Sequence, residues 1–172
     1  MKHIIVRYLC FLVIGVLLPG ILALQPAPSL RVLIFLETEC PICQKTTKRV
    51  QLLADAYADR VAFEAVYPTE TVTKQAVFAF ERAYAFRLPH RLDPRHRLVN
   101  RYRATTTPEV LLLVGGDRIL YRGSVDNQFY KLGRYRQAPT EFYLREAIEA
   151  ALHGRPVSTS YVVPVGCLIN IR

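Results

Sequence analysis

The chain has 172 residues, 51% of them hydrophobic, and a formal net charge of +9 at pH 7. This length allows one domain with a substantial core and excludes two domains of ordinary size. Many of the basic residues are arginines spread between residues 82 and 103, without a nucleic-acid-binding motif. We therefore expect a solvated basic face, with contact to an anionic membrane surface or an acidic partner as the alternative, and no nucleic-acid partner.

The N-terminus has the pattern of an export signal. Lys2 and Arg7 precede an apolar stretch at residues 8–24, which contains the small residue Ala23 near its end. A stretch of 17 residues is at the short limit for crossing a membrane, so an uncleaved anchor that tethers the protein is the alternative. In both cases we expect an exported protein in the periplasm or another extracytoplasmic compartment. The expected organisation is a signal peptide or N-terminal membrane anchor at 1–24, a short linker at 25–29 and one domain at 30–172.

Strands and helices alternate along the first half of the expected domain. Apolar runs predict the strands, and apolar residues at helical spacing predict the helices. Asp93 and Pro94 are suited to the start of a short helix. The expected elements are a strand at 31–36, a helix that begins near Cys40 and ends at 58, a strand at 61–67, a helix at 72–86 and a helix from 93 to 102. This alternation predicts parallel strand pairing with right-handed crossovers.

The second half predicts antiparallel pairing. Two apolar runs flank the turn Gly115-Gly116-Asp117, which is typical of a hairpin. Thr140 is suited to cap a closing helix, and Gly154 follows the end of that helix. The expected elements are strands at 109–114 and 118–123, a helix at 140–153 and a strand-like stretch at 161–171.

The motif Cys40-Pro41-Ile42-Cys43 lies between the first strand and the helix that follows. Backbone N–H groups of the first helical turn point toward Cys40 and stabilise its thiolate, and Pro41 suits this turn because its missing N–H costs no hydrogen bond. Cys43 lies one turn along on the same face and can attack a mixed disulfide formed at Cys40. The motif therefore predicts a reversible disulfide in which Cys40 attacks and Cys43 resolves.

Two other uses of this cysteine pair remain open. The pair is half of a typical zinc site, although the sequence contains no second pair at a suitable spacing. It is also compatible with an inert structural disulfide in an exported protein. We expect neither a metal ion nor a cofactor.

Glu39 directly precedes Cys40. Its carboxylate disfavours a neighbouring thiolate, so we expect the pKa of Cys40 to be less depressed than in a strong periplasmic oxidant. A less stabilised thiolate implies a more reducing couple. An exported reductant would then receive its electrons from a membrane-bound thiol partner.

Cys167 has no assigned partner in the expected domain. It is a buried core residue, a site of intermolecular pairing or a resolving cysteine for Cys40. Three polar residues after the hairpin, Asp126, Asn127 and Tyr130, either line the cleft near Cys40 or form turns.

The expected domain resembles the thioredoxin fold in its strand-CPIC-helix unit, in Thr107-Pro108 before a later strand, and in its final hairpin and helix. The resemblance implies an α/β protein with a central mixed β-sheet flanked by helices. It also implies a cis peptide bond before Pro108, which leaves the backbone of Thr107 free to pair with an extended substrate above Cys40. Pro41, Thr107 and Pro108 are therefore the expected substrate-binding residues. A trans proline that starts a strand is the alternative.

Within this fold, the sequence is similar to redoxin-domain proteins of the alkyl hydroperoxide reductase/thiol-specific antioxidant type, at residues 35–41, 93–94, 107–110, 121–129 and 165–169. We expect an exported thiol-disulfide oxidoreductase that uses the Cys40/Cys43 couple on the thiols or disulfides of proteins. One alternative is a thiol peroxidase with Cys40 as the peroxidatic cysteine. The other is a non-enzymatic copper-handling protein, which needs an exposed histidine such as His90 near the two thiols.

Overall fold

The computed structural model describes residues 30–171. The expected signal peptide or anchor at 1–24 and the linker at 25–29 lie outside the described residues, so both stay predictions. In the described part of the chain, no helix combines the length and apolarity needed to cross a membrane.

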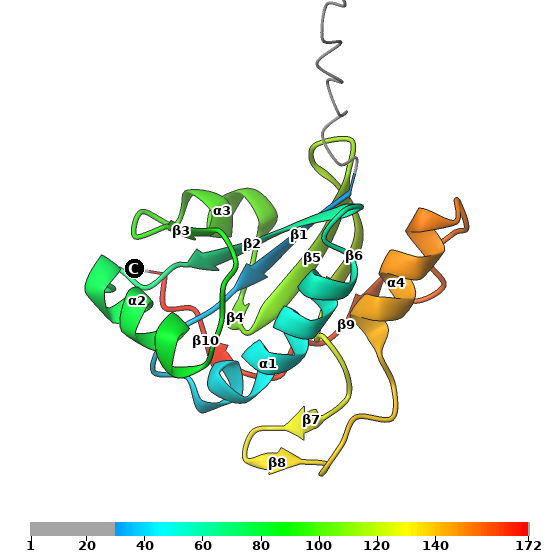
Figure 1. The fold of residues 1–172 in the computed structure, drawn as a ribbon. Coiled ribbons are helices and arrows are strands. Elements are labelled where there is room, and N and C mark those ends of the chain that lie inside the picture. Colours follow the sequence, from blue (N-terminus) through cyan, green and yellow to red (C-terminus); the bar gives the residue numbers. More distant parts are fainter. Residues whose placement is uncertain (1–29, 172) are drawn as a thin grey trace, which may run out of the picture.

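A six-stranded mixed sheet forms the centre of the domain (Figure 1). Its strands follow the spatial order β3-β2-β1-β5-β6-β9. Their bounds are Leu30–Phe35 for β1, Val61–Tyr67 for β2, His90–Leu92 for β3, Glu109–Val114 for β5, Arg118–Gly123 for β6 and Tyr161–Val162 for β9. β1 pairs in parallel with β2 and antiparallel with β5, which continues into the hairpin β5–β6. The predicted central mixed sheet, the parallel pairing and the hairpin are confirmed.

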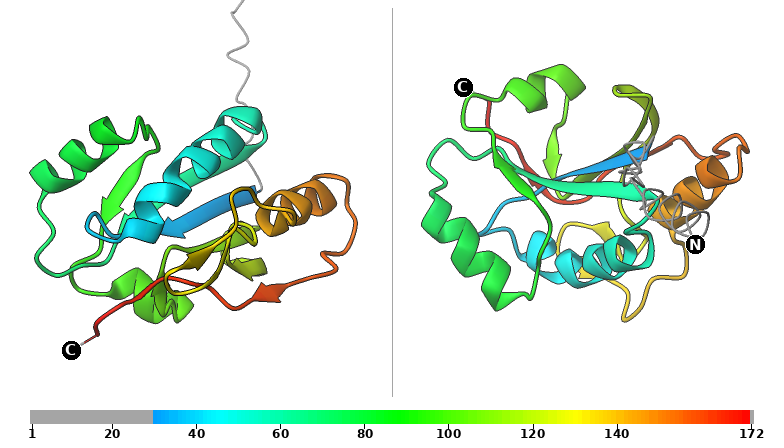
Figure 2. Two further views of the ribbon diagram at one scale, coloured as in Figure 1. Left: turned by 90° about the horizontal axis from the view of Figure 1, so that it is seen from below. Right: turned by 45° about the horizontal axis from the view of Figure 1, so that its top comes forward.

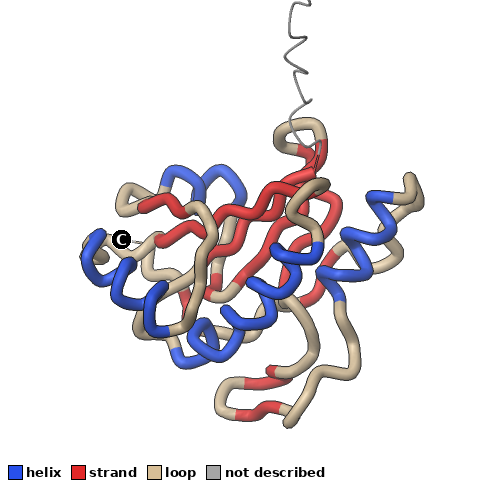
Figure 3. The backbone as a smooth tube through the Cα atoms, viewed as in Figure 1, coloured by secondary structure: helices blue, strands red, loops and turns tan. Residues whose placement is uncertain are grey.

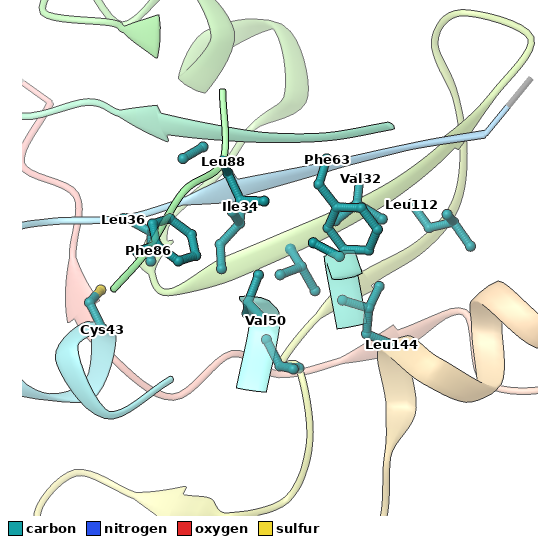
Figure 4. Close-up of a cluster of buried hydrophobic side chains, with 14 of the residues drawn as sticks. Val32, Ile34, Leu36, Cys43, Val50, Phe63, Phe86, Leu88, Leu112 and Leu144 are labelled. Atoms are coloured by element: carbon teal, nitrogen blue, oxygen red, sulfur yellow. The ribbon is translucent and has the colours of Figure 1, made fainter. Parts of the chain in front are cut away.

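Helices cover both faces of this sheet (Figure 2). One face carries α1 (Pro41–Ala56), α2 (Lys74–Ala83) and α4 (Tyr143–Leu152), and the other carries α3 (Arg97–Tyr102). In β1, Val32 and Ile34 join the larger buried cluster with Val50 of α1, as Figure 4 shows. Leu33 and Phe35 join the smaller cluster on the opposite face. Because β1 is buried on both faces, its residues are apolar without alternation.

Two smaller sheets complete the fold. The strands β7 (Phe129–Lys131) and β8 (Arg134–Tyr135) form a hairpin that extends away from the main sheet (Figure 3). The strand β4 (Thr106–Thr107) pairs antiparallel with β10 (Cys167–Leu168). The C-terminal segment therefore returns to the strand that precedes Pro108, and the predicted strand-like stretch at 161–171 is divided between β9 and β10.

Three predicted strands, at 61–67, 109–114 and 118–123, are confirmed with the same bounds. The helix predicted at 72–86 is shorter, because α2 ends at Ala83 and Ala85 adopts a positive φ of 50°. The sequence does not predict β3, because its residues His-Arg-Leu show no apolar run.

The short helix α3 begins later than the prediction. Asp93 does accept hydrogen bonds from the first turn, from the backbone N–H groups of Arg97, Leu98 and Val99, at 2.8, 2.8 and 3.1 Å. However, His96 adopts a left-handed conformation with φ of 53°, and the helix starts only after it. Asp93 therefore caps α3 from a position four residues before its first residue.

The closing helix also begins later than the prediction, because its N-cap is Phe142 and not Thr140. Thr140 instead hydrogen-bonds Asn127 through both its hydroxyl and its backbone N–H. Asp126 forms an ion pair with Arg49 of α1. Asp126 and Asn127 therefore organise the loop between β6 and α4, and Tyr130 on β7 is 52% exposed.

Candidate dithiol active site

Cys40 lies at the junction where the chain leaves β1 and enters α1. It is the N-cap residue of α1, with an extended backbone at φ −78° and ψ 114°, and Pro41 occupies the first helical turn. No side-chain hydrogen bond caps this helix end. The first-turn N–H groups are therefore free to interact with a negative charge on the sulfur of Cys40.

Cys43 lies one turn further along and is fully buried. Figure 4 shows it at one end of the larger hydrophobic cluster. The backbone N–H of Glu37 donates to its Sγ at 3.5 Å. Burial in this cluster raises the pKa of the Cys43 thiol well above its ordinary value. Cys43 is therefore the protonated partner of the pair.

The pKa of Cys40 is lowered to about 5, from an ordinary value of 9.0. The hydrogen bond from the Cys43 side chain is the main cause, and it outweighs the opposing effect of burial. Further lowering comes from the side chain of Cys167 and from the backbone N–H groups of Cys43 and Ile42. A pKa of about 5 leaves Cys40 ionised at neutral pH, and the first-turn N–H groups named from the sequence supply the smaller part of this shift.

Glu39 is exposed, on the residue before this thiolate. The lowered pKa of Cys40 weighs against the reducing couple that the sequence suggested from Glu39, because a stabilised thiolate stabilises the reduced form. The role of Glu39 in tuning this pKa stays a prediction.

Thr107 and Pro108 lie beside Cys40. The peptide bond between them is cis, which confirms the geometry implied by the resemblance. The backbone oxygen of Thr107 is 3.4 Å from the Sγ of Cys40. The structure therefore brings Thr107 and Pro108 to the thiol, and Pro41 is exposed at the same helix end. Their role in substrate binding stays a prediction.

Cys167 is a third thiol at this site. Its position on β10 lies opposite Thr107, and its Sγ is 2.7 Å from the Sγ of Cys40. Burial raises the pKa of Cys167 to about 12, and so does its hydrogen bond to Cys40. The residue is only partly buried, so it does not serve as an ordinary core cysteine. Two sequence signals pointed to it, the unpaired cysteine count and the similarity at residues 165–169.

Gly166 is a further site residue, which the sequence indicated only as part of the similar stretch at residues 165–169. A Cβ atom at this position would lie 2.1 Å from the backbone oxygen of Thr107. Real Cβ atoms do not approach an oxygen so closely, so only glycine lets the C-terminal segment lie against Thr107 and Pro108.

His90 does not join this group. Its Nδ1 is 2.8 Å from the Oε1 of Glu81, and its ring packs against Tyr67 and Phe78. Across residues 30–171, no group of three or more His, Cys, Asp or Glu side chains is placed to hold a metal ion. The copper-handling alternative required a histidine at the two thiols, and His90 is bound elsewhere.

The sequence matches no protein-family model and no curated protein. Solved structures do share its fold. An uncharacterized conserved protein from Geobacillus kaustophilus is 22% identical, with a TM-score of 0.72 over 84% of this chain and 78% of that chain.

Two further structures carry names that describe their fold or activity. A thioredoxin-like protein in its oxidised form is 13% identical, with a TM-score of 0.57 over 75% of this chain and 81% of that chain. A thiol-disulfide oxidoreductase from Bacteroides fragilis is 15% identical, with a TM-score of 0.51 over 73% of this chain and 80% of that chain. This chain therefore has a thioredoxin-like fold, with a central mixed β-sheet flanked by helices.

Proposed function

We propose that the protein is an exported thiol-disulfide oxidoreductase that uses the Cys40/Cys43 couple on protein substrates. The observation that supports this most directly is the asymmetry of the two thiols. Cys40 is the N-cap residue of α1 and has a lowered pKa, whereas Cys43 is fully buried in the hydrophobic cluster and has a raised pKa. The fold is also that of the thiol-disulfide oxidoreductase from Bacteroides fragilis.

The chemistry takes place in two exchange steps. The Cys40 thiolate attacks one sulfur of a substrate disulfide, forms a mixed disulfide and releases the other substrate sulfur as a thiolate. Cys43 then loses its proton and attacks the Cys40 sulfur. The products are a Cys40–Cys43 disulfide and the second substrate thiolate, so the substrate gains two electrons and the protein loses two. The reverse sequence oxidises a dithiol substrate.

The substrate would dock beside the thiolate as an extended strand. The backbone oxygen of Thr107 lies 3.4 Å from the Sγ of Cys40, Pro108 follows Thr107 directly, and Pro41 is exposed at the helix end beside Cys40. A membrane-bound thiol partner would renew the couple, which fits an exported protein or one tethered through residues 8–24. The low pKa of Cys40 favours a couple that accepts electrons readily.

The test is turnover of a protein disulfide, such as insulin with dithiothreitol, by the full chain. We expect Cys40→Ser to reduce the rate by roughly 100-fold or more, because the other two thiols within residues 30–171, Cys43 and Cys167, both have raised pKa values. Cys10→Ser changes a cysteine outside the described residues and is the matched control, with an unchanged rate.

Cys43 is best tested in a Cys167→Ser background, because the third thiol also lies at Cys40. We expect Cys43→Ser/Cys167→Ser to accumulate a mixed disulfide between Cys40 and the substrate. Steady turnover by this double variant would overturn the proposal. So would peroxide-driven oxidation of Cys40 without any exchange with protein disulfides, which would identify a thiol peroxidase.

A further inference from the structure

The C-terminal strand β10 occupies the edge of β4. Cys167 pairs with Thr107, and Leu168 pairs with Thr106, in antiparallel register. The backbone N–H of Ile169 extends this pairing by donating to the oxygen of Thr105 at 2.9 Å. This is the strand edge that the proposed function assigns to an extended protein substrate.

Cys167 has the position of a substrate cysteine on that strand. Its Sγ is 2.7 Å from the Sγ of Cys40, whereas a disulfide bond measures about 2.05 Å. A shift of less than about 1 Å would therefore bring the two sulfurs to bonding distance. Gly166 makes this approach possible, because any side chain there would collide with the backbone oxygen of Thr107.

We propose that residues 165–169 act as a tethered substrate and that Cys167 is a third redox-active residue, which forms a disulfide with Cys40. This proposal rests on the proposed function and adds a second intramolecular disulfide to it.

The exchange balances within the chain. Cys167 loses its proton, and its thiolate attacks the Cys40 sulfur of the Cys40–Cys43 disulfide. The Cys40–Cys167 bond forms, the Cys40–Cys43 bond breaks, and the electron pair leaves on Cys43, which takes up a proton. No external oxidant or reductant is consumed. In the same way, Cys167 can resolve a mixed disulfide between Cys40 and a substrate.

The arrangement requires the segment to move during turnover. Cys40 is only 1% exposed, so a protein substrate cannot reach its sulfur while β10 is in place. Backbone hydrogen bonds hold the segment together with the half-buried side chains of Val165, Cys167 and Ile169, which pack against the hydrophobic clusters, whereas Leu168 is 80% exposed. One side of it borders a polar cavity of about 180 Å³, which is lined in part by Glu37 and His96. None of the side chains that hold the segment is fully buried, so local opening costs less than the opening of a strand of the central sheet.

The test uses the full chain with the Cys43→Ser substitution, reduced and then treated with glutathione disulfide. Glutathione first forms a mixed disulfide with Cys40, and a docked Cys167 then displaces it. We expect peptide mass mapping to find Cys40 linked to Cys167 at least about 10-fold more often than to glutathione. Cys40 linked to glutathione beside a free Cys167 thiol would overturn the proposal.

A substitution without sulfur chemistry tests the docking itself. Cys43→Ser/Gly166→Ala places a Cβ against Thr107, so we expect the ratio to shift at least about 10-fold toward the glutathione adduct. Cys43→Ser/Leu168→Ala, which changes an exposed side chain on the same strand, is the matched control and should keep the original ratio. Equal ratios in both variants would contradict docking through Gly166.

The two proposals fail in different ways. If Cys43→Ser shows no Cys40–Cys167 disulfide but Cys43→Ser/Cys167→Ser still traps a substrate at Cys40, the tethered substrate is wrong and the oxidoreductase stands. If Cys40→Ser turns over protein disulfides at the normal rate, the proposed function is wrong.

Discussion

The N-termini of α1 and α3 start from the same physical situation and use it differently. Each presents backbone N–H groups that have no partner within the helix. At α3, the buried carboxylate of Asp93 accepts three of them. At α1, no side chain caps the helix, and the pKa of Cys40 is lowered mainly by the side chain of Cys43, with a further contribution from the backbone N–H groups of Cys43 and Ile42. Free backbone N–H groups at a helix start thus stabilise the fold at α3 and contribute to stabilising a reactive charge at α1.

The largest effect is expected from removing the Asp93 side chain that caps α3. Asp93→Ala leaves three N–H groups in a buried setting without their acceptor, so we expect a loss of about 2–3 kcal/mol in the free energy of unfolding. Urea denaturation measures it. Asp59→Ala removes an exposed carboxylate and should change the same free energy by less than about 0.5 kcal/mol. An equal loss in both variants would contradict the capping role.

The second prediction concerns the reactive side and depends on pH. The pKa of Cys40 in the reduced protein is lowered to about 5 from an ordinary value of 9.0. A lowered pKa gives stability that is complete above the ordinary value and is lost as the pH falls toward the folded value. The raised pKa values of Cys43 and Cys167 act only at higher pH, where those thiols begin to ionise in the unfolded chain.

The reduced wild-type protein should therefore gain about 1–2 kcal/mol in unfolding free energy between about pH 6 and about pH 8, relative to Cys40→Ser. The serine hydroxyl does not ionise in this range, so the difference between the two proteins isolates the thiolate. Parallel pH profiles for the two proteins would show that the helix donors and neighbouring thiols do not stabilise a charge at Cys40.

The smallest effect is expected from removing the charge of Glu39, the exposed residue before Cys40. Glu39 is exposed to solvent, which screens its carboxylate from the neighbouring sulfur. We expect Glu39→Gln to lower the pKa of Cys40 by less than about 0.5 unit, as measured by the ultraviolet absorbance of the thiolate against pH. A decrease of a full unit in the pKa of Cys40 would show that Glu39 is one of the groups that set the redox potential of the Cys40/Cys43 couple. An increase in this pKa would contradict the expected effect of the Glu39 charge.

The sequence was sufficient for the elements whose own residues specify them. Residues 110–114 of the strand at 109–114 are a continuous apolar run in the sheet, and Gly115-Gly116 supplies the positive φ values of its turn. The start of α3 was harder to predict from the sequence, because the left-handed conformation of His96 depends on how Asp93 binds the next turn.

The dithiol motif was visible in the sequence because its two cysteines are close in the chain, whereas Cys167 had three open roles there, one of them a resolving cysteine for Cys40. Cys167 is 127 residues from Cys40, and β10 is only two residues long. Its pairing with β4 depends on a close contact at Gly166 rather than on a local pattern. A single sequence contains no record of such a contact, so the position of Cys167 required the structure.

The covalent tether of β10 sets a threshold for any partner that competes for the edge of β4. A linked strand is present at its own binding site at an effective concentration on the order of millimolar, which a free peptide seldom reaches. Short peptides and small disulfides should therefore compete poorly for Cys40. A folded protein that offers a longer complementary strand can exceed the few hydrogen bonds of β10. Selection among partners would then depend on the length of strand that each one contributes.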